Sequence, residues 1–251
     1  MTVKKRKAEQ RDPTTAALKI FEDDGYLVLN DALSKEQLVS LREECDGLYE
    51  KTTADELVEL GCVLDIFASG NRSQPARVDI EAYKEERSAF LEKESSPHIL
   101  SLIFEDLPEY IRPLFPQRQK RDGLYFFNEH YVVKPPESKV EFRWHQDDTE
   151  QLGMCVHRET IPWYLSAWCA LDDVTTDNGA LQFRHDDGTE TPPIVVSAGS
   201  VLIFRSDIWH FSAANTTGSI RRAFYVQYSA SPITARPQSS DPLCCAIRID
   251  P

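Results

Sequence analysis

The sequence changes character near its middle, and this change limits the folds that the chain can adopt. Up to Pro116 the patterns are helical, with a capping box at Ser34 and Gln37 followed by apolar residues at helical spacing as far as Leu48. From Leu124 onward the chain is a series of short β-type runs separated by Gly, Pro, Asn and Asp. These runs are residues 124–133, 164–171, 180–183, 194–196, 201–204 and 223–228. Helices followed by antiparallel strands predict an α+β protein with a mainly β core, in which the strands form a double-sheet jelly roll.

The N-terminal half should supply helices that pack on one of the sheets. Residues 26–29 predict a short strand, and one or two further helices are expected between residues 84 and 115. The polar stretch 70–75 predicts a loop. Arg72 and Arg77 near this loop could contact an anionic ligand, although solvated arginines are the more common case.

The length of 251 residues suits one domain with a sizeable core. We expect residues 1–12 to form a disordered basic tail and residues 13–251 to form a single domain, with a helical part over 13–116 and a jelly-roll core over 124–230. The 28 Lys and Arg residues against 41 Asp and Glu residues give a net charge of −13, which argues against a nucleic-acid partner.

The sequence also bears on location. No apolar run approaches the roughly twenty residues needed to cross a bilayer, and the N-terminus lacks a hydrophobic signal core. The C-terminus does not end in a Ser-Lys-Leu type peroxisomal signal. A cytoplasmic protein without a membrane partner is therefore expected, with a nuclear location left open by the basic run from Lys4 to Lys7.

The six cysteines contain no Cys-x-x-Cys pair, which favours reduced thiols that serve mostly in packing. Adjacent Cys244 and Cys245 could bind a metal or crosslink two chains, but an exposed C-terminal tail is the simpler expectation.

The main functional motif is the His-x-Asp pair of His145 and Asp147, which closes an apolar and aromatic run. In a strand, residues two apart point the same way, so these side chains should share one face. A third metal ligand is expected from His210. Two imidazoles and one carboxylate on one side of an octahedron leave three positions open, as in non-haem Fe(II) oxygenases. A lone His-x-Asp pair also occurs by chance, so the neighbouring motifs matter.

Several spacings downstream agree with this interpretation. Trp168 lies eleven residues before Gly179 of an Asn-Gly pair, and Arg221 lies eleven residues after His210. With these motifs, residues 130–228 resemble the phytanoyl-CoA dioxygenase (PhyH-like) branch of the Fe(II)/2-oxoglutarate-dependent oxygenases, with a fainter likeness near the N-terminus. The resemblance implies a double-stranded β-helix, which is the same architecture as the predicted jelly roll.

The resemblance also implies roles for the motif residues. His145, Asp147 and His210 would bind Fe(II). Arg221 would bind the far carboxylate of 2-oxoglutarate through its bidentate guanidinium. Arg222 is its neighbour and would point the opposite way along the strand.

Further cosubstrate contacts are expected from Ser212, Trp168, His130 and Gln146. His130 precedes a Lys-Pro-Pro sequence at residues 134–136 that matches an element of the family. For these four residues, ordinary packing or orientation of a loop is the alternative.

By the same resemblance, the protein would use Fe(II), 2-oxoglutarate and O2. The aromatic residues and the single arginine of residues 149–165 suggest a small organic substrate with an apolar body. The expected reaction is oxidation, most simply hydroxylation, of an unactivated C–H bond, with decarboxylation of 2-oxoglutarate to succinate and CO2. The carboxylate of Asp147 favours oxygenation over halogenation, while desaturation, epoxidation and rearrangement stay open. Residues 149–165, which include His157, Arg158 and Trp163, are expected to form the substrate rim.

Two other functions are compatible with the sequence. One is a non-catalytic jelly-roll module that uses the mouth of the fold to bind a sugar or a partner, although the intact triad with Arg221 argues against it. The other is a non-redox metalloenzyme that uses His145, Asp147 and His210 around zinc or manganese.

Overall fold

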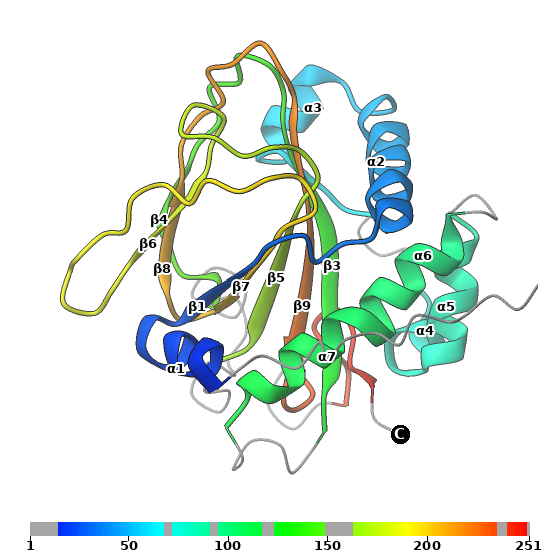
Figure 1. Ribbon diagram of the computed structural model, residues 1–251. Helices are drawn as coiled ribbons and strands as arrows, with labels where there is room; N and C mark the ends of the chain where they lie inside the picture. Colours follow the sequence, from blue (N-terminus) through cyan, green and yellow to red (C-terminus); the bar gives the residue numbers. More distant parts are fainter. Residues whose placement is uncertain are drawn as a thin grey trace, which may run out of the picture.

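The computed structural model of the protein describes residues 15–67, 72–90, 95–116, 123–148, 163–234 and 240–249. Its centre is formed by two antiparallel sheets that face each other, and helices cover the outer face of the larger sheet (Figure 1). The expected tail over residues 1–12 lies outside the described residues. No helix within the described ranges is long and apolar enough to span a membrane.

The two sheets form the predicted double-stranded β-helix. The larger sheet has the strand order β1-β7-β5-β9-β3-β10, with β2 also paired to β3. Its strands are β1 (Tyr26–Leu29), β2 (Val63–Leu64), β3 (Tyr125–Lys134), β5 (Leu165–Ala170), β7 (Val201–Arg205), β9 (Arg221–Ser229) and β10 (Ile247–Arg248). The smaller sheet has the order β4-β8-β6, made of β4 (Phe142–His145), β8 (Trp209–Ser212) and β6 (Leu181–Arg184). The prediction of an α+β fold with a mainly β core is confirmed.

The helices precede the strands in the chain, except that strands β1 and β2 lie among the helices. They are α1 (Thr15–Asp24), α2 (Lys35–Tyr49), α3 (Ala54–Glu59), α4 (Gln74–Val78), α5 (Ile80–Ser88), α6 (Ser96–Ser101), the π-helical η1 (Leu102–Asp106), α7 (Leu107–Ile111) and the 3-10 turn η2 (Arg112–Leu114). The predicted capping box opens α2, where Gln37 N donates to Ser34 Oγ (3.1 Å) and Ser34 N donates to Gln37 Oε1 (2.9 Å). Figure 1 shows α2 and α6 on the side of the large sheet that faces away from β4, β6 and β8.

Alternation along the strands separates two apolar cores. On β9, Phe224, Val226 and Tyr228 belong to the core beneath the helices, while Ala223 and Tyr225 belong to the core between the sheets. All five side chains are buried. The space between the sheets therefore receives side chains from both of them.

A buried ionic cluster ties the helices to the larger sheet. The guanidinium of Arg87 in α5 binds Glu44 of α2 (Nη1–Oε1 2.5 Å) and Glu129 of β3 (Nε–Oε1 2.9 Å). Tyr131 donates a hydrogen bond to Glu44, and Tyr83 donates one to Glu129. Because a buried charge is strongly destabilising unless it is paired, this cluster fixes α2 and α5 on β3.

Two predicted segments differ from the structure: the β-type run 194–196 forms no strand, and the loop 70–75 ends earlier than expected. Residues 194–196 form only isolated bridges, with Ile194 paired to Leu181 and Val196 paired to Val174. In the predicted loop 70–75, α4 already begins at Gln74, and residues 70 and 71 lie outside the described residues.

The expected environments of Arg72 and Cys245 are also wrong. The guanidinium of Arg72 lies 4.7 Å from the centre of the Phe67 ring and donates to Cys245 Sγ at 2.8 Å, so this arginine is not solvated. Cys245 is buried, because the chain returns through β10 to pair with β3. The second cysteine of the pair, Cys244, is half-buried.

Gly179 brings the loop before β6 against the end of β8. Its φ is +89°, and an added Cβ would lie 2.6 Å from the carbonyl oxygen of Ala213. We expect Gly179→Ala to lower the free energy of unfolding by about 2–4 kcal/mol, because both the backbone and Ala213 resist the methyl group. Urea denaturation measures this loss.

The matched control is Gly188→Ala. Gly188 has a φ of +85°, but an added Cβ meets no atom of the described residues within 4 Å. This variant should lose only about 1 kcal/mol, from the backbone conformation alone. Equal losses in the two variants would contradict the close approach of Ala213.

Candidate metal centre

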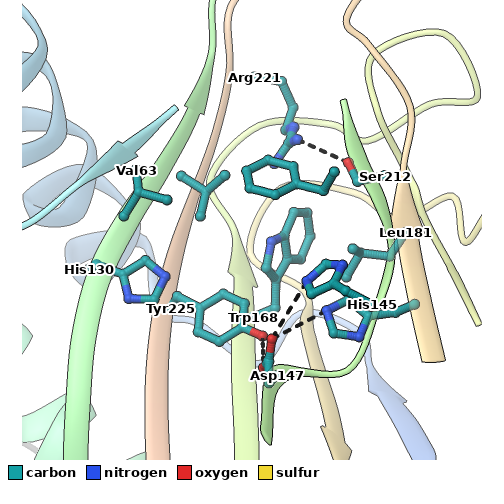
Figure 2. Close-up of a pocket in the computed structure, with 12 residues that line it drawn as sticks. Val63, His130, His145, Asp147, Trp168, Leu181, Ser212, Arg221 and Tyr225 are labelled. Atoms are coloured by element: carbon teal, nitrogen blue, oxygen red, sulfur yellow. Dashed lines mark hydrogen bonds and ion pairs between the residues drawn. The ribbon is translucent and has the colours of Figure 1, made fainter. Parts of the chain in front are cut away.

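His145, Asp147 and His210 come together in one cluster at the cavity between the sheets. Figure 2 shows His145 beside Asp147 there. His145 is the last residue of β4 and pairs directly with His210 of β8. The expectation that His145 and Asp147 share a strand is wrong, because Asp147 lies two residues beyond the end of β4. The ligand atoms nevertheless converge: Asp147 Oδ1 is 3.7 Å from His145 Nε2 and 3.4 Å from His210 Nε2.

Backbone carbonyl groups orient both imidazoles. Nδ1 of His145 lies 2.7 Å from the carbonyl oxygen of Arg143, and Nδ1 of His210 lies 3.1 Å from that of Ile208. A carbonyl oxygen can only accept, so Nδ1 of each ring carries the proton and donates it. Nε2 is then the nitrogen that can bind a metal.

Three donors hold the second oxygen of the Asp147 carboxylate. Oδ2 accepts from Tyr225 OH at 2.6 Å, from Ser166 Oγ at 2.9 Å and from Gln227 Nε2 at 3.4 Å. Burial raises the pKa of Asp147, but the two histidines and the Tyr225 hydrogen bond outweigh it, and the net shift of the pKa is downward. The carboxylate is therefore ionised at neutral pH, with Oδ1 turned toward the histidines.

Arg221 lies at the other end of the cavity (Figure 2). Its guanidinium is 5.5 Å from the Trp168 ring, Nε donates to the carbonyl oxygen of Asn178 at 3.3 Å, and Nη2 lies 3.5 Å from Ser212 Oγ. Burial lowers the pKa of Arg221 to about 10, so the side chain is still charged at neutral pH. Arg222 points the opposite way and pairs with two carboxylates outside the cavity.

A cavity of about 150 Å³ joins these two polar ends. Besides the triad and Arg221, the predicted residues His130, Trp168 and Ser212 line it. Gln146 is not among the lining residues, and its amide donates to the carbonyl oxygen of Asp207 at 2.5 Å. Gln146 was expected either to contact the cosubstrate or to orient a loop. Its contact with Asp207 fits the second role, in the loop after β4.

His130 stacks on Tyr225, with ring centres 4.8 Å apart and an interplanar angle of 15°. Burial lowers the pKa of His130 to about 4. The imidazole is therefore neutral at physiological pH. Its Nδ1 lies 3.5 Å from Asn128 Nδ2, which can only donate, so Nε2 carries the ring proton and is the nitrogen left to donate to a ligand.

Five lining residues were not singled out from the sequence. They are Tyr225 and the apolar residues Val63, Val132, Phe142 and Leu181. Tyr225 could have been found, because it lies four residues after Arg221 in one strand and so shares its face. The apolar residues carry no signal that separates them from ordinary core residues.

Most of the predicted substrate rim lies outside the described residues. This applies to residues 149–162, and hence to His157 and Arg158. Trp163 is described and packs away from the cavity, stacked on Phe115 with ring centres 5.2 Å apart and with the Arg205 guanidinium 5.4 Å from its ring. Its expected place at the rim is therefore wrong.

The donor set fits a divalent first-row metal. The three ligand atoms lie within 4.8 Å of one another, so a modest closure would place all three on one ion. Two imidazoles and one carboxylate suit Fe(II), and their arrangement on one side leaves positions for other ligands. Fold and site together define a double-stranded β-helix protein with a mononuclear centre of two histidines and one carboxylate.

Comparison with known proteins gives the family. The model of the phytanoyl-CoA dioxygenase (PhyH) family matches residues 21–223, so the chain belongs to this family. It is thus an Fe(II)/2-oxoglutarate-dependent oxygenase, which confirms the predicted enzyme class and its cofactors. Phytanoyl-CoA dioxygenase domain-containing protein 1 of Danio rerio is 24% identical, and the match covers 81% of this chain and 86% of that protein.

Solved structures share the fold. The carbocyclase SnoK from nogalamycin biosynthesis has a TM-score of 0.59 at 18% identity, over 91% of this chain and 92% of that chain. EctD from S. alaskensis, with 2-oxoglutarate and 5-hydroxyectoine, has a TM-score of 0.59 at 19% identity, over 88% of this chain and 78% of that chain. At these identities the likeness concerns the fold.

The Tyr225 hydroxyl should contribute to metal affinity, because it holds Asp147 with Oδ1 toward the histidines. We expect Tyr225→Phe to weaken Fe(II) binding about 10-fold, as loss of a hydrogen bond to a ligating carboxylate commonly does. Anaerobic Fe(II) titration followed by calorimetry measures the change.

Tyr228→Phe is the control for this variant. Tyr228 lies on the same strand, but its hydroxyl donates to the carbonyl oxygen of Ile103 under the helices. Fe(II) affinity should be unchanged in Tyr228→Phe. A similar loss in both variants would mean that the effect comes from general destabilisation.

Proposed function

We propose that the protein uses O2 to oxidise a C–H bond of a small organic molecule, most simply by hydroxylation, and converts 2-oxoglutarate to succinate and CO2 in the same turnover. In hydroxylation one oxygen atom of O2 goes to the substrate and the other to succinate. One observation carries this proposal. A two-histidine, one-carboxylate centre shares a small cavity with a buried guanidinium that has no carboxylate partner among the described residues. A metal centre alone would fit many enzymes, whereas the added positive charge fits a diacid that reaches from the metal to Arg221.

In this proposal, His145 Nε2, Asp147 Oδ1 and His210 Nε2 hold Fe(II), and Arg221 holds the distal carboxylate of 2-oxoglutarate with Ser212 beside it. Bound iron and 2-oxoglutarate supply the oxygen activation that protein side chains cannot provide. The contribution of the chain is to fix these two ends at the correct separation.

The remaining lining residues have supporting roles. Phe142, Leu181 and Trp168 form apolar walls that exclude water from the reacting atoms. His130 presents a neutral imidazole, held by its stack on Tyr225, and we assign it a contact to the cosubstrate. Because Gln146 is turned to the backbone of Asp207, we assign it no such contact.

The outcome of the reaction depends on which substrate atom lies next to the metal. Among proteins of this fold, one is described as a carbocyclase, and another structure contains 5-hydroxyectoine. Hydroxylation is the simplest outcome because it requires only one C–H bond within reach. The small, mainly apolar cavity suits a small organic substrate rather than a polymer.

Anaerobic titration tests the proposal. Addition of 2-oxoglutarate to the Fe(II)-loaded protein should produce the weak visible charge-transfer band of the iron chelate. A binding module or a zinc hydrolase should produce none. A screen of small organic acids, amines and alcohols in air, read by succinate release, then identifies substrates. Absence of both the band and succinate release would contradict the proposed function.

The triad provides the matched variants. His210→Ala should abolish the band and lower succinate formation by at least about 100-fold, because it removes a metal ligand at the centre of the site. His98→Ala removes a histidine of α6 that lies outside the cavity, and should leave both unchanged. Activity that survives His210→Ala would show that the metal is bound elsewhere.

A further inference from the structure

Lys134, the last residue of β3, is a buried cation next to the cavity. Its side chain is 0% exposed. Nζ donates to the Ser212 carbonyl oxygen at 2.9 Å, to Ser212 Oγ at 2.8 Å and to the Ala213 carbonyl oxygen. An ammonium has three protons, and three acceptors surround it, so this pocket is built for the charged form of the side chain.

Lys134 and Arg221 lie side by side. They are direct partners in the pairing of β3 with β9, so their side chains share one face of the sheet. Neither forms an ion pair with a carboxylate in the part of the chain that the structure describes. Burial, followed by the charge of Arg221, lowers the pKa of Lys134 to about 7, while Cys62 and Glu141 act in the opposite direction. Two buried positive charges without a counterion are costly, and an anion in the cavity would offset them.

Ser212 links Lys134 to the cavity, because it contacts Lys134 and lines the cavity. Its hydroxyl donates to the carbonyl oxygen of Gly179 at 2.7 Å and accepts from Lys134. The single hydroxyl proton is therefore in use, and Ser212 cannot donate it to a carboxylate without a change of partner. Lys134 Nζ also lies 5.0 Å from the ring of Phe142, which lines the cavity, whereas Lys134 is not among the lining residues. The ammonium thus acts from behind the lining residues.

We propose that Lys134 is a positioning residue of the cosubstrate site: it fixes Ser212 and the end of β8, and it supplies a second positive charge behind Arg221 that makes the site select a diacid over a monoacid. This inference rests on the proposed function. Gly179 lies against the same cluster: an added Cβ would lie 2.6 Å from the carbonyl oxygen of Ala213 and 3.1 Å from Lys134 Nζ.

Proton uptake follows from this arrangement. With a pKa of about 7, most of the Lys134 population is neutral at pH 8 in the protein without cosubstrate. Binding of the distal carboxylate stabilises the ammonium and raises its pKa, so a proton is taken up. The affinity for 2-oxoglutarate should therefore fall as the pH rises above 7, whereas a monoacid without the distal carboxylate should show a weaker dependence.

The test compares two 2-oxo acids on the anaerobic Fe(II) protein. 2-Oxoglutarate carries the distal carboxylate, and 2-oxobutyrate chelates metal in the same way without it. In Lys134→Met, which keeps the length of the side chain but not its charge, the Kd of 2-oxoglutarate should rise roughly 10- to 100-fold. The Kd of 2-oxobutyrate should change less than about 3-fold. Lys139→Met, at an exposed position five residues on, should change neither.

An equal rise of both dissociation constants would overturn the inference, because a merely structural role would not distinguish the two acids. If Lys134→Met does not fold, calorimetry on the unchanged protein decides. Calorimetry in two buffers of different ionisation enthalpy at pH 8 gives the number of protons that the protein takes up on binding. This number should be larger for 2-oxoglutarate than for 2-oxobutyrate. Equal uptake would overturn the inference. Failure of the unchanged protein to bind either acid would instead contradict the proposed function itself.

Discussion

The carboxylate of Asp147 joins the two sheets of the β-helix. Its Oδ2 accepts hydrogen bonds from Ser166 of β5 and from Tyr225 and Gln227 of β9, all in the larger sheet. Its Oδ1 faces the histidines of β4 and β8 in the smaller sheet. Oδ2 therefore anchors the side chain to the larger sheet, and Oδ1 is directed toward the metal site. Because the three donors fix the rotation of the carboxylate, one oxygen is kept for the metal, and a bidentate arrangement that would occupy a further coordination position is disfavoured.

A second polar cluster closes the opposite end of the cavity. Nδ2 of Asn215 lies within 3.0 Å of the carbonyl oxygens of Lys134, Pro135 and Ser219 and shares its two protons among them, which holds the β8–β9 connection against the end of β3. Arg221 and Lys134 stand in this cluster as the two positive charges. The cavity thus has a negative metal-binding end and a positive end, separated by apolar walls. This polarity matches a cosubstrate that chelates with one end and carries a charge at the other.

Part of this arrangement could be predicted from the sequence because it depends on spacing. His210 and Arg221 are eleven residues apart along β8 and β9, and strand alternation separates Arg221 from Arg222. The same alternation, followed further, would have included Tyr225. The capping box at Ser34 is equally local, and it was found.

The rest depends on contacts between distant segments. Lys134 and Ser212 are 78 residues apart, and no local pattern indicates that their side chains meet. β2 and β10 have two residues each, which is too short for any periodic signal. Return of β10 to β3 is what buries Cys245 and gives Arg72 its partner, so their environments could not be read from the neighbouring residues. His145 and Asp147 meet across a turn rather than along a strand, a geometry that spacing alone does not distinguish.

The most direct measurement is a crystal structure of the protein grown without oxygen in the presence of Fe(II) and 2-oxoglutarate, with iron located by its anomalous scattering. We expect one iron bound by His145 Nε2, His210 Nε2 and a single oxygen of Asp147, at distances of about 2.0–2.2 Å. We also expect the distal carboxylate of 2-oxoglutarate at the guanidinium of Arg221. Iron bound at other residues, or a carboxylate directed away from Arg221, would contradict this assignment of the site.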